Sequence, residues 1–154
     1  MTGKNKILIV DDAAIDRITL RKILEESYEI IEAENGQQAL DILESQTEWD
    51  FISAVLLDLV MPEFSGYQFM KEYQKIETYR RIPVVVATVE GDTQTERECL
   101  ELGAWDFVTK PYDPMVIRFR IKNVIERSQH QLSKELKYRA DYDTLTGIYN
   151  KTKF

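Results

Sequence analysis

The sequence is poor in cysteine and histidine, with one of each in 154 residues. The single cysteine, Cys99, cannot form an internal disulfide, which suits a reducing compartment. The histidine, His130, lies far from Cys99 along the chain. Zinc is held in proteins mostly by clustered cysteine and histidine side chains, so no zinc site is expected.

Long apolar runs are also missing. No run approaches the roughly 18 residues that a membrane span requires. The apolar stretch at 7–10 is followed at once by Asp11 and Asp12, which leaves it far shorter than the core of a secretory signal. We therefore expect a cytoplasmic protein that contacts no membrane.

An excess of positive charge is absent as well. The formal net charge is −7 at pH 7, with 44% hydrophobic and 31% charged residues, as in ordinary soluble proteins. Residues 1–113 contain no basic cluster that could attract phosphates. Binding to nucleic acid is therefore not expected.

Short apolar segments rich in branched residues predict strands. Segments 6–10, 51–57 and 83–87 are nearly continuous apolar runs, as in buried parallel strands, and 28–33 and 105–109 are weaker candidates. Helical spacing of apolar residues between them predicts further helices, which cover approximately 15–24, 39–43, 69–76 and 93–102. This alternation predicts an α/β fold, with a doubly wound parallel sheet and helices on both faces.

A longer helix is expected at the end of the chain. No glycine or proline interrupts residues 115–140, so a helix should run from Pro114 to about Ala140. Its first half is apolar and should pack on the domain, whereas its polar second half should project. An incomplete apolar stripe could support a two-stranded coiled coil, although a solvated linker helix remains an alternative; its members are Ile121, Ile125, Leu132 and Leu136.

Polar residues end the expected strands. Asp11 and Asp12 follow the first strand, Asp58 the third, Thr88 the fourth and Lys110 the fifth. The carboxyl ends of parallel strands share one edge of a sheet, where ligands bind in open α/β folds. Three carboxylates gathered there repel one another and require a cation, and oxygen ligands suit Mg²⁺.

Asp58 ends the most apolar strand and is the candidate nucleophile. An aspartate accepts a phosphoryl group well when a metal and a lysine neutralise the charge on the transferred oxygens. Each residue also has a structural interpretation: the Asp pair as a helix cap, Thr88 as a strand former and Lys110 as a surface lysine.

Four motifs together resemble the response-regulator receiver family over residues 5 to about 127. They are ILIVDD at 7–12, LLDLVMPEFSG at 56–66, PVVVAT at 83–88 and GAWDFVTKP at 103–111. The resemblance implies a flavodoxin-like (βα)5 fold with strand order 2-1-3-4-5. It also implies that the domain accepts a phosphoryl group from a sensor histidine kinase or phosphotransfer protein.

The resemblance assigns a role to each matching site residue. Asp58 corresponds to the phosphoacceptor, Asp12 to a direct Mg²⁺ ligand and Asp11 to a ligand through water. The backbone carbonyl of Val60 would complete the protein ligands. The other assignments are Thr88 as the switch hydroxyl, Lys110 as the cation on the phosphoryl group, Phe107 as the rotating switch aromatic, a cis bond before Pro111, and Val60 and Glu90 as positions that tune the phosphoryl lifetime.

The last residues carry a second resemblance. DTLTGIYNKTKF at 143–154 is similar to the opening of a diguanylate cyclase (GGDEF) domain, except that Lys151 stands where arginine is more usual. Without that family, the segment reads as a polar tail with a Thr-Gly turn. We expect a receiver domain at 1–127, a helical linker at 128–141 and, at 142–154, the truncated start of an output domain that makes cyclic di-GMP.

These expectations describe a phosphorylation switch and not an enzyme that acts on a separate substrate. Phosphorylation should favour a homodimer through the fourth helix, fifth strand and fifth helix. A degenerate receiver that serves only as an interaction scaffold is the alternative. A flavin or nucleotide domain would want a glycine-rich loop, which residues 11–15 lack. An aspartyl-phosphate hydrolase would place its nucleophile after the first strand.

Overall fold

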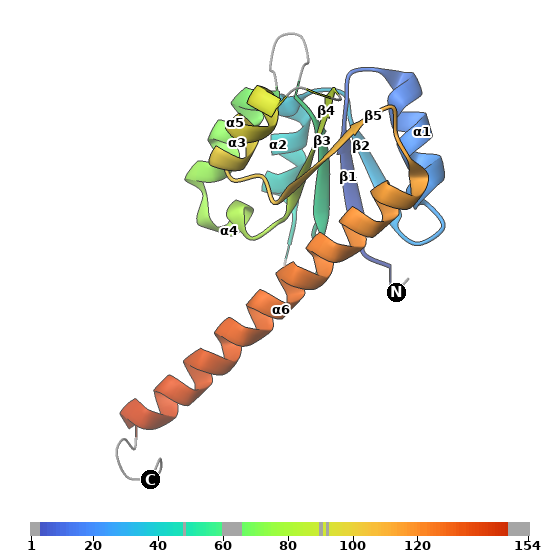
Figure 1. Ribbon diagram of the computed structural model, residues 1–154. Coiled ribbons are helices and arrows are strands. Elements are labelled where there is room, and N and C mark those ends of the chain that lie inside the picture. The colour runs from blue at the N-terminus through green and yellow to red at the C-terminus, as the bar shows by residue number, and fades with distance from the viewer. Residues whose placement is uncertain (1–3, 48, 60–65, 90, 92, 148–154) are drawn as a thin grey trace.

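Strands and helices alternate along the chain (Figure 1). The computed structural model describes residues 4–47, 49–59, 66–89, 91 and 93–147, with side chains of the last helix described as far as Gln131. The strands are β1 (Lys6–Val10), β2 (Glu29–Ala33), β3 (Ala54–Asp58), β4 (Val84–Val89) and β5 (Asp106–Lys110). The helices are α1 (Ala14–Leu24), α2 (Gly36–Ser45), α3 (Gly66–Lys75), α4 (Glu77–Arg80), α5 (Thr93–Glu101) and α6 (Pro114–Gly147).

The five strands form one parallel sheet in the order β2-β1-β3-β4-β5. This arrangement confirms the predicted doubly wound α/β fold. The register pairs Val10 with Leu57 and Asp58 with Ala87, the residue before Thr88. The carboxyl ends of β1, β3 and β4 therefore lie side by side at one edge of the sheet.

Two apolar cores lie on opposite faces of the sheet. Because side chains alternate along a strand, Leu8 and Val10 join the core under α2, α3 and α5, whereas Ile7 and Ile9 join the core under α1 and α6. Both faces are thus covered, which explains why β1, β3 and β4 are nearly continuous apolar runs.

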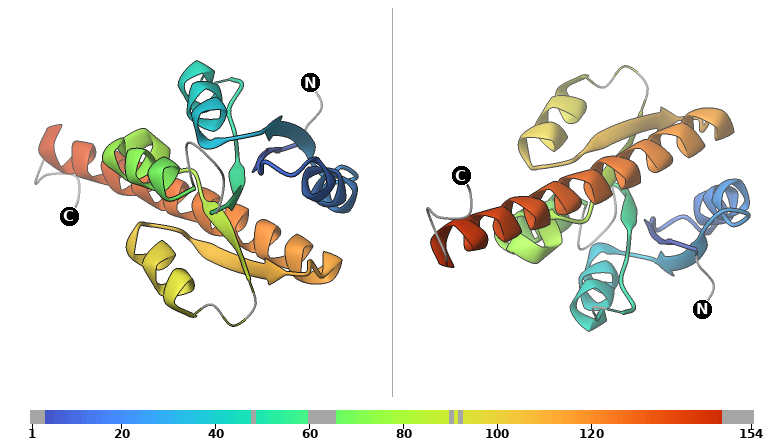
Figure 2. Two further views of the ribbon diagram at one scale, coloured as in Figure 1. Left: turned by 90° about the horizontal axis from the view of Figure 1, so that it is seen from above. Right: turned by 90° about the horizontal axis from the view of Figure 1, so that it is seen from below.

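Helix α6 has 34 residues, about 51 Å at 1.5 Å per residue. It extends beyond the sheet in both views of Figure 2. The expected end near Ala140 is wrong, because the helix continues to Gly147 and no helix-breaking residue precedes that glycine.

The expected apolar stripe on α6 also needs correction. Ile121 and Ile125 are 0% and 4% exposed and belong to the core beneath the helix, so they cannot contact a second copy. Val116 and Phe119, which were expected against the domain, are 40% and 66% exposed. The buried face of the helix instead carries Ile117, Ile121 and Val124.

Smaller differences concern the ends of elements. β3 begins at Ala54, later than expected, and leaves Phe51 exposed. The one-turn helix α4 was not predicted. Gly103 acts as the helix stop after α5: it adopts a φ of 102°, and the next residue, Ala104, donates its N–H to the Cys99 carbonyl. No helix in the described residues is long and apolar enough to cross a membrane.

Candidate functional site

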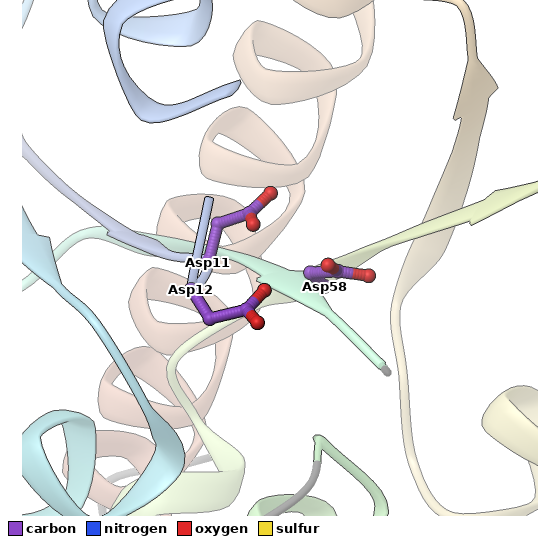
Figure 3. A group of neighbouring side chains, drawn as sticks. All are labelled: Asp11, Asp12 and Asp58. Atoms are coloured by element: carbon purple, nitrogen blue, oxygen red, sulfur yellow. The ribbon is translucent and has the colours of Figure 1, made fainter. Parts of the chain in front are cut away.

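Three carboxylates meet at the carboxyl edge of the sheet. One oxygen from each of Asp11, Asp12 and Asp58 lies within 4.8 Å of the others. Figure 3 shows the side chains of Asp11 and Asp12, from the segment after β1, extending toward Asp58 at the end of β3. Asp11 and Asp58 are buried, whereas Asp12 is exposed. The predicted acidic cluster is therefore assembled.

Asp11 is the least compensated member of this cluster. Its Oδ1 accepts a hydrogen bond from the Ala13 N–H at 2.9 Å, but its buried Oδ2 has no hydrogen-bond partner among the described residues. Burial raises the pKa of Asp11 to about 6; the Ala13 hydrogen bond opposes this rise and the Asp58 charge adds to it. A buried, unpartnered oxygen beside two further carboxylates fits a divalent cation with oxygen ligands.

Lys110 is the cation of the site. Its Nζ lies 3.4 Å from Oδ2 of Asp58 and also 3.4 Å from Oδ2 of Asp16. Burial disfavours the charged amine, but the carboxylates of Asp58, Asp11 and Asp16 outweigh this effect and raise the pKa of Lys110. Lys110 is therefore charged and in contact with the third-strand aspartate. The peptide bond between Lys110 and Pro111 is cis, as expected.

Thr88 and Phe107 lie beside the cluster on neighbouring strands. The Thr88 hydroxyl is buried and donates to the Val108 carbonyl of β5 at 3.4 Å. Phe107 is partly buried, and the guanidinium of Arg120 lies 5.8 Å from the centre of its ring. Arg120 also pairs with Asp106 at 2.8 Å, so helix α6 contacts β5 at the aromatic residue.

Gly66 fixes the backbone beneath Asp58. A Cβ at this position would lie 2.5 Å from the Asp58 carbonyl oxygen and 2.5 Å from the Leu59 Cα, which no side chain can accept. The Gly66 N–H donates to the Leu59 carbonyl at 2.9 Å. The absence of a side chain lets the start of α3 pack directly against the end of β3.

A second charged group braces the same edge. Arg17 donates to the backbone carbonyl of Asp11 at 2.6 Å and pairs with Glu32 at 3.0 Å. Arg21 pairs with the other Glu32 oxygen at 2.6 Å. The hydrogen bond from Arg21 is the main reason that the pKa of Glu32 lies below its usual value, with Arg17 adding to it and burial opposing it.

The structure thus brings together Asp11, Asp12, Asp58 and Lys110. Val60 and Glu90 lie outside the described residues.

Sequence reasoning missed other residues of this edge, namely Asp16, Arg17, Gly66 and Tyr112. Spacing could have revealed the first of them, because a residue one turn into the helix that follows Asp12 returns toward the strand end. The Tyr112 hydroxyl, which is buried without a hydrogen-bond partner among the described residues, left no sequence signal.

The family model for the response regulator receiver domain matches residues 7–122. The chain therefore belongs to the response regulator receiver family. Receiver domains accept phosphoryl groups from histidine kinases and generally bind Mg²⁺ at an aspartate cluster. The acidic cluster and its lysine lie within the matched residues.

Individual relatives support the same assignment. The chain is 36% identical over 126 residues to the transcriptional regulatory protein SrrA of Staphylococcus aureus strain NCTC 8325, an alignment that covers 81% of this chain and 49% of SrrA. The chain thus spans about half the length of the curated relatives it matches.

Solved structures agree with the fold. A response regulator from Chloroflexus aurantiacus is 27% identical with a TM-score of 0.74, covering 80% of this chain and 98% of that one. The receiver domain of a histidine kinase from Syntrophus aciditrophicus is 31% identical with a TM-score of 0.70, covering 79% and 90%.

Proposed function

We propose that this chain is an active phosphoacceptor and that Asp58 takes the phosphoryl group from a sensor histidine kinase or phosphotransfer protein. The main support for this proposal is the contact of Lys110 with Asp58 at 3.4 Å, beside two further carboxylates. A scaffold that had lost phosphotransfer would have no need to keep a buried Asp11 whose Oδ2 has no hydrogen-bond partner among the described residues.

The proposed reaction needs only side chains of this edge and one metal ion. An Asp58 oxygen bonds to phosphorus as the phosphorus–nitrogen bond of the donor phosphohistidine breaks, and the imidazole leaves with the electron pair. Lys110 donates to a phosphoryl oxygen as charge gathers there. Hydrolysis reverses the state: water attacks phosphorus, the bond to Asp58 breaks, and inorganic phosphate departs. The domain acts on itself and not on a separate substrate.

Asp12 and Asp58 would hold Mg²⁺ directly and Asp11 through a water molecule, with the Val60 carbonyl completing the protein ligands. A bound Mg²⁺ would supply the positive charge that offsets the clustered carboxylates and the transferred oxygens. This assignment is supported by the unpartnered Asp11 Oδ2, which is buried where only a cation, a water molecule or a proton could satisfy it.

The direct test is labelling by a small phosphodonor. Acetyl phosphate with Mg²⁺ should add one phosphoryl group, seen by intact-mass spectrometry, and peptide mapping should place it on Asp58. An Asp58→Asn variant or a chelator should prevent labelling, whereas Asp41→Asn, which removes an exposed charge on α2, should not. Failure to label the wild-type protein would favour the scaffold alternative, whereas undiminished labelling of Asp58→Asn would rule out Asp58 as the phosphoacceptor.

The switch should involve Thr88 and Phe107. Thr88 now donates to Val108, so turning toward a phosphoryl oxygen would break that bond and vacate space beside the ring of Phe107. The phosphoryl group can shift the conformation only through such differential contacts. Structures with and without beryllofluoride test this step, and identical positions of both side chains would count against it.

We propose that phosphorylation favours homodimerisation through the face formed by α5, β5 and α6, and that the dimer controls the output. Exposed apolar side chains from this face and its edge support it; they are Val89, Leu100, Val116 and Phe119. Sedimentation with and without beryllofluoride and Mg²⁺ tests the proposal. An unchanged association state would leave rotation within a constitutive dimer as the next candidate.

The proposed output is a diguanylate cyclase that follows a receiver at 1–127 and a linker at 128–141. Its support is the DTLTG motif at 143–147 and the need to bring two GTP-bearing domains together. The name of SrrA suggests transcription as a second candidate, but that alignment spans only about half of SrrA. Cyclic di-GMP formation by the full-length cytoplasmic parent decides between them, because a transcription factor would form none.

A further inference from the structure

Lys110 is shared between two carboxylates that come from different elements. Asp58 ends β3, and Asp16 lies in the first turn of α1. Each presents its Oδ2 at 3.4 Å from the same Nζ, and both accept a hydrogen bond from it. The lysine that should meet the incoming phosphoryl group therefore already has two anionic partners.

Asp16 is placed to act on the lysine and not on the metal. It does not belong to the group of carboxylates whose oxygens lie within 4.8 Å of one another. Its side chain is 31% exposed, compared with 10% for Asp58, so it faces the solvent from which a phosphodonor arrives. The start of α1 directly follows the segment that carries Asp12, so Asp16 in the first turn of α1 lies close to the acidic cluster and contacts Lys110.

We propose that Asp16 is a positioning residue that restrains Lys110 and slows phosphoryl transfer to Asp58. This inference depends on the proposed function. Lys110 must leave Asp16, at least in part, to donate to the phosphoryl oxygens. The Asp16 carboxylate also repels the anionic donor. Both effects act in the same direction and oppose the transfer.

The reaction chosen for the test is transfer from acetyl phosphate. An Asp58 oxygen bonds to phosphorus as the bond from phosphorus to the acetate oxygen breaks, and acetate leaves with the electron pair. No proton has to move. A small donor also removes any role of Asp16 in contacting a kinase, so the measured rate reports on the site alone.

Asp16→Asn keeps the size of the side chain and removes its charge. At saturating Mg²⁺ the variant should be labelled about three- to tenfold faster than the wild-type protein, as expected for one charge several ångströms away near a protein surface. The advantage should shrink as the salt concentration rises, because the screening length falls from ~10 Å at 0.1 M to ~3 Å at 1 M. Asp16→Glu should stay close to the wild-type rate.

Asp41→Asn is the matched control, because it changes the net charge equally from an exposed position on α2. It should leave the labelling rate unchanged. Equal rates for Asp16→Asn and wild type would overturn the inference while leaving the proposed function intact, and so would a salt-independent gain. An Asp16 that serves only the dipole of α1 would change thermal stability and not the rate. If the wild-type protein is not labelled, the proposed function fails and this inference fails with it.

Discussion

Two clusters of charged residues lie side by side at the carboxyl edge of the sheet, and they are built in opposite ways. In the braced cluster, Glu32 sits between Arg17 and Arg21, and its pKa is lowered. In the acidic cluster, Asp11 is buried beside further carboxylates, and its pKa is raised to about 6. Glu32 is thus compensated by two arginines, whereas the three carboxylates of the acidic cluster have one lysine near them in the described part of the chain, which fits a site for an additional cation.

Arg17 joins the two clusters, because it donates to the backbone carbonyl of Asp11 while pairing with Glu32. The braced cluster therefore holds the backbone of the acidic cluster at Asp11. Arg17 thus fixes the backbone at Asp11, while Oδ2 of the Asp11 side chain has no hydrogen-bond partner among the described residues.

The largest expected effect is on the stability of Asp11→Asn. The variant keeps the shape and removes the buried charge, so in Mg²⁺-free buffer near pH 8 it should be more stable than wild type by about 3 kcal/mol, corresponding to a shift of about two pKa units. Urea unfolding measures the difference. Mg²⁺ should stabilise the wild-type protein more than the variant.

The raised pKa of Asp11 also determines how the folding stability changes with pH. The folded-state pKa of Asp11, about 6, exceeds its ordinary value of 3.8, so the folded protein binds more protons between these values. Stability should therefore fall as the pH rises from about 4 to 6, relative to Asp11→Asn. Glu32 has a lowered pKa, so its contribution is present above its ordinary value of 4.5 and is lost as the pH falls through the folded value. An Asp11→Asn curve parallel to wild type would contradict the comparison.

The second largest effect on stability is expected for Gly66→Ala, which changes the packing of α3 against the backbone at Asp58. The added Cβ would overlap the backbone at Asp58 and Leu59, and we expect a loss of about 2 kcal/mol because backbone atoms must shift. Labelling of Asp58 should slow as well, since its carboxylate would move relative to Lys110. Unchanged stability and labelling would show that α3 can tilt away freely.

Glu32→Gln tests the braced cluster. The variant weakens two charge-assisted hydrogen bonds in a half-buried position and should cost about 1 kcal/mol of stability at neutral pH. At saturating Mg²⁺ it should still be labelled on Asp58, because it touches no reacting atom. The opposite signs for Asp11→Asn and Glu32→Gln separate the two clusters; a gain in stability for Glu32→Gln would remove the distinction.

The smallest effect is expected for Tyr112→Phe. Its buried hydroxyl has no hydrogen-bond partner among the described residues, and burial and the carboxylates of Asp11, Asp16 and Asp58 raise its pKa. Removing an unsatisfied polar atom should increase stability by about 0.5 to 1 kcal/mol in chemical unfolding. A loss of stability would show instead that an ordered water satisfies the hydroxyl.

The sequence by itself predicted the sheet, the alternation of elements and the acidic edge. Buried parallel strands must be apolar on both faces, and their ends must be polar where a ligand binds, so residues such as Asp58 and Lys110 stand out locally. The stop at Gly103 was predictable for a similar local reason, since few other residues accept a positive φ.

Only the tertiary structure decided how the charges pair and which side of α6 is buried. Asp16 and Lys110 are far apart in the chain and meet because α1 and β5 flank the same strand ends. The spacing of Ile121 and Ile125 would also fit a stripe between two copies of the chain, but both side chains pack in the core against the sheet. A one-dimensional pattern gives the periodicity of a helix, whereas the partner of each face depends on contacts between segments that are distant in sequence.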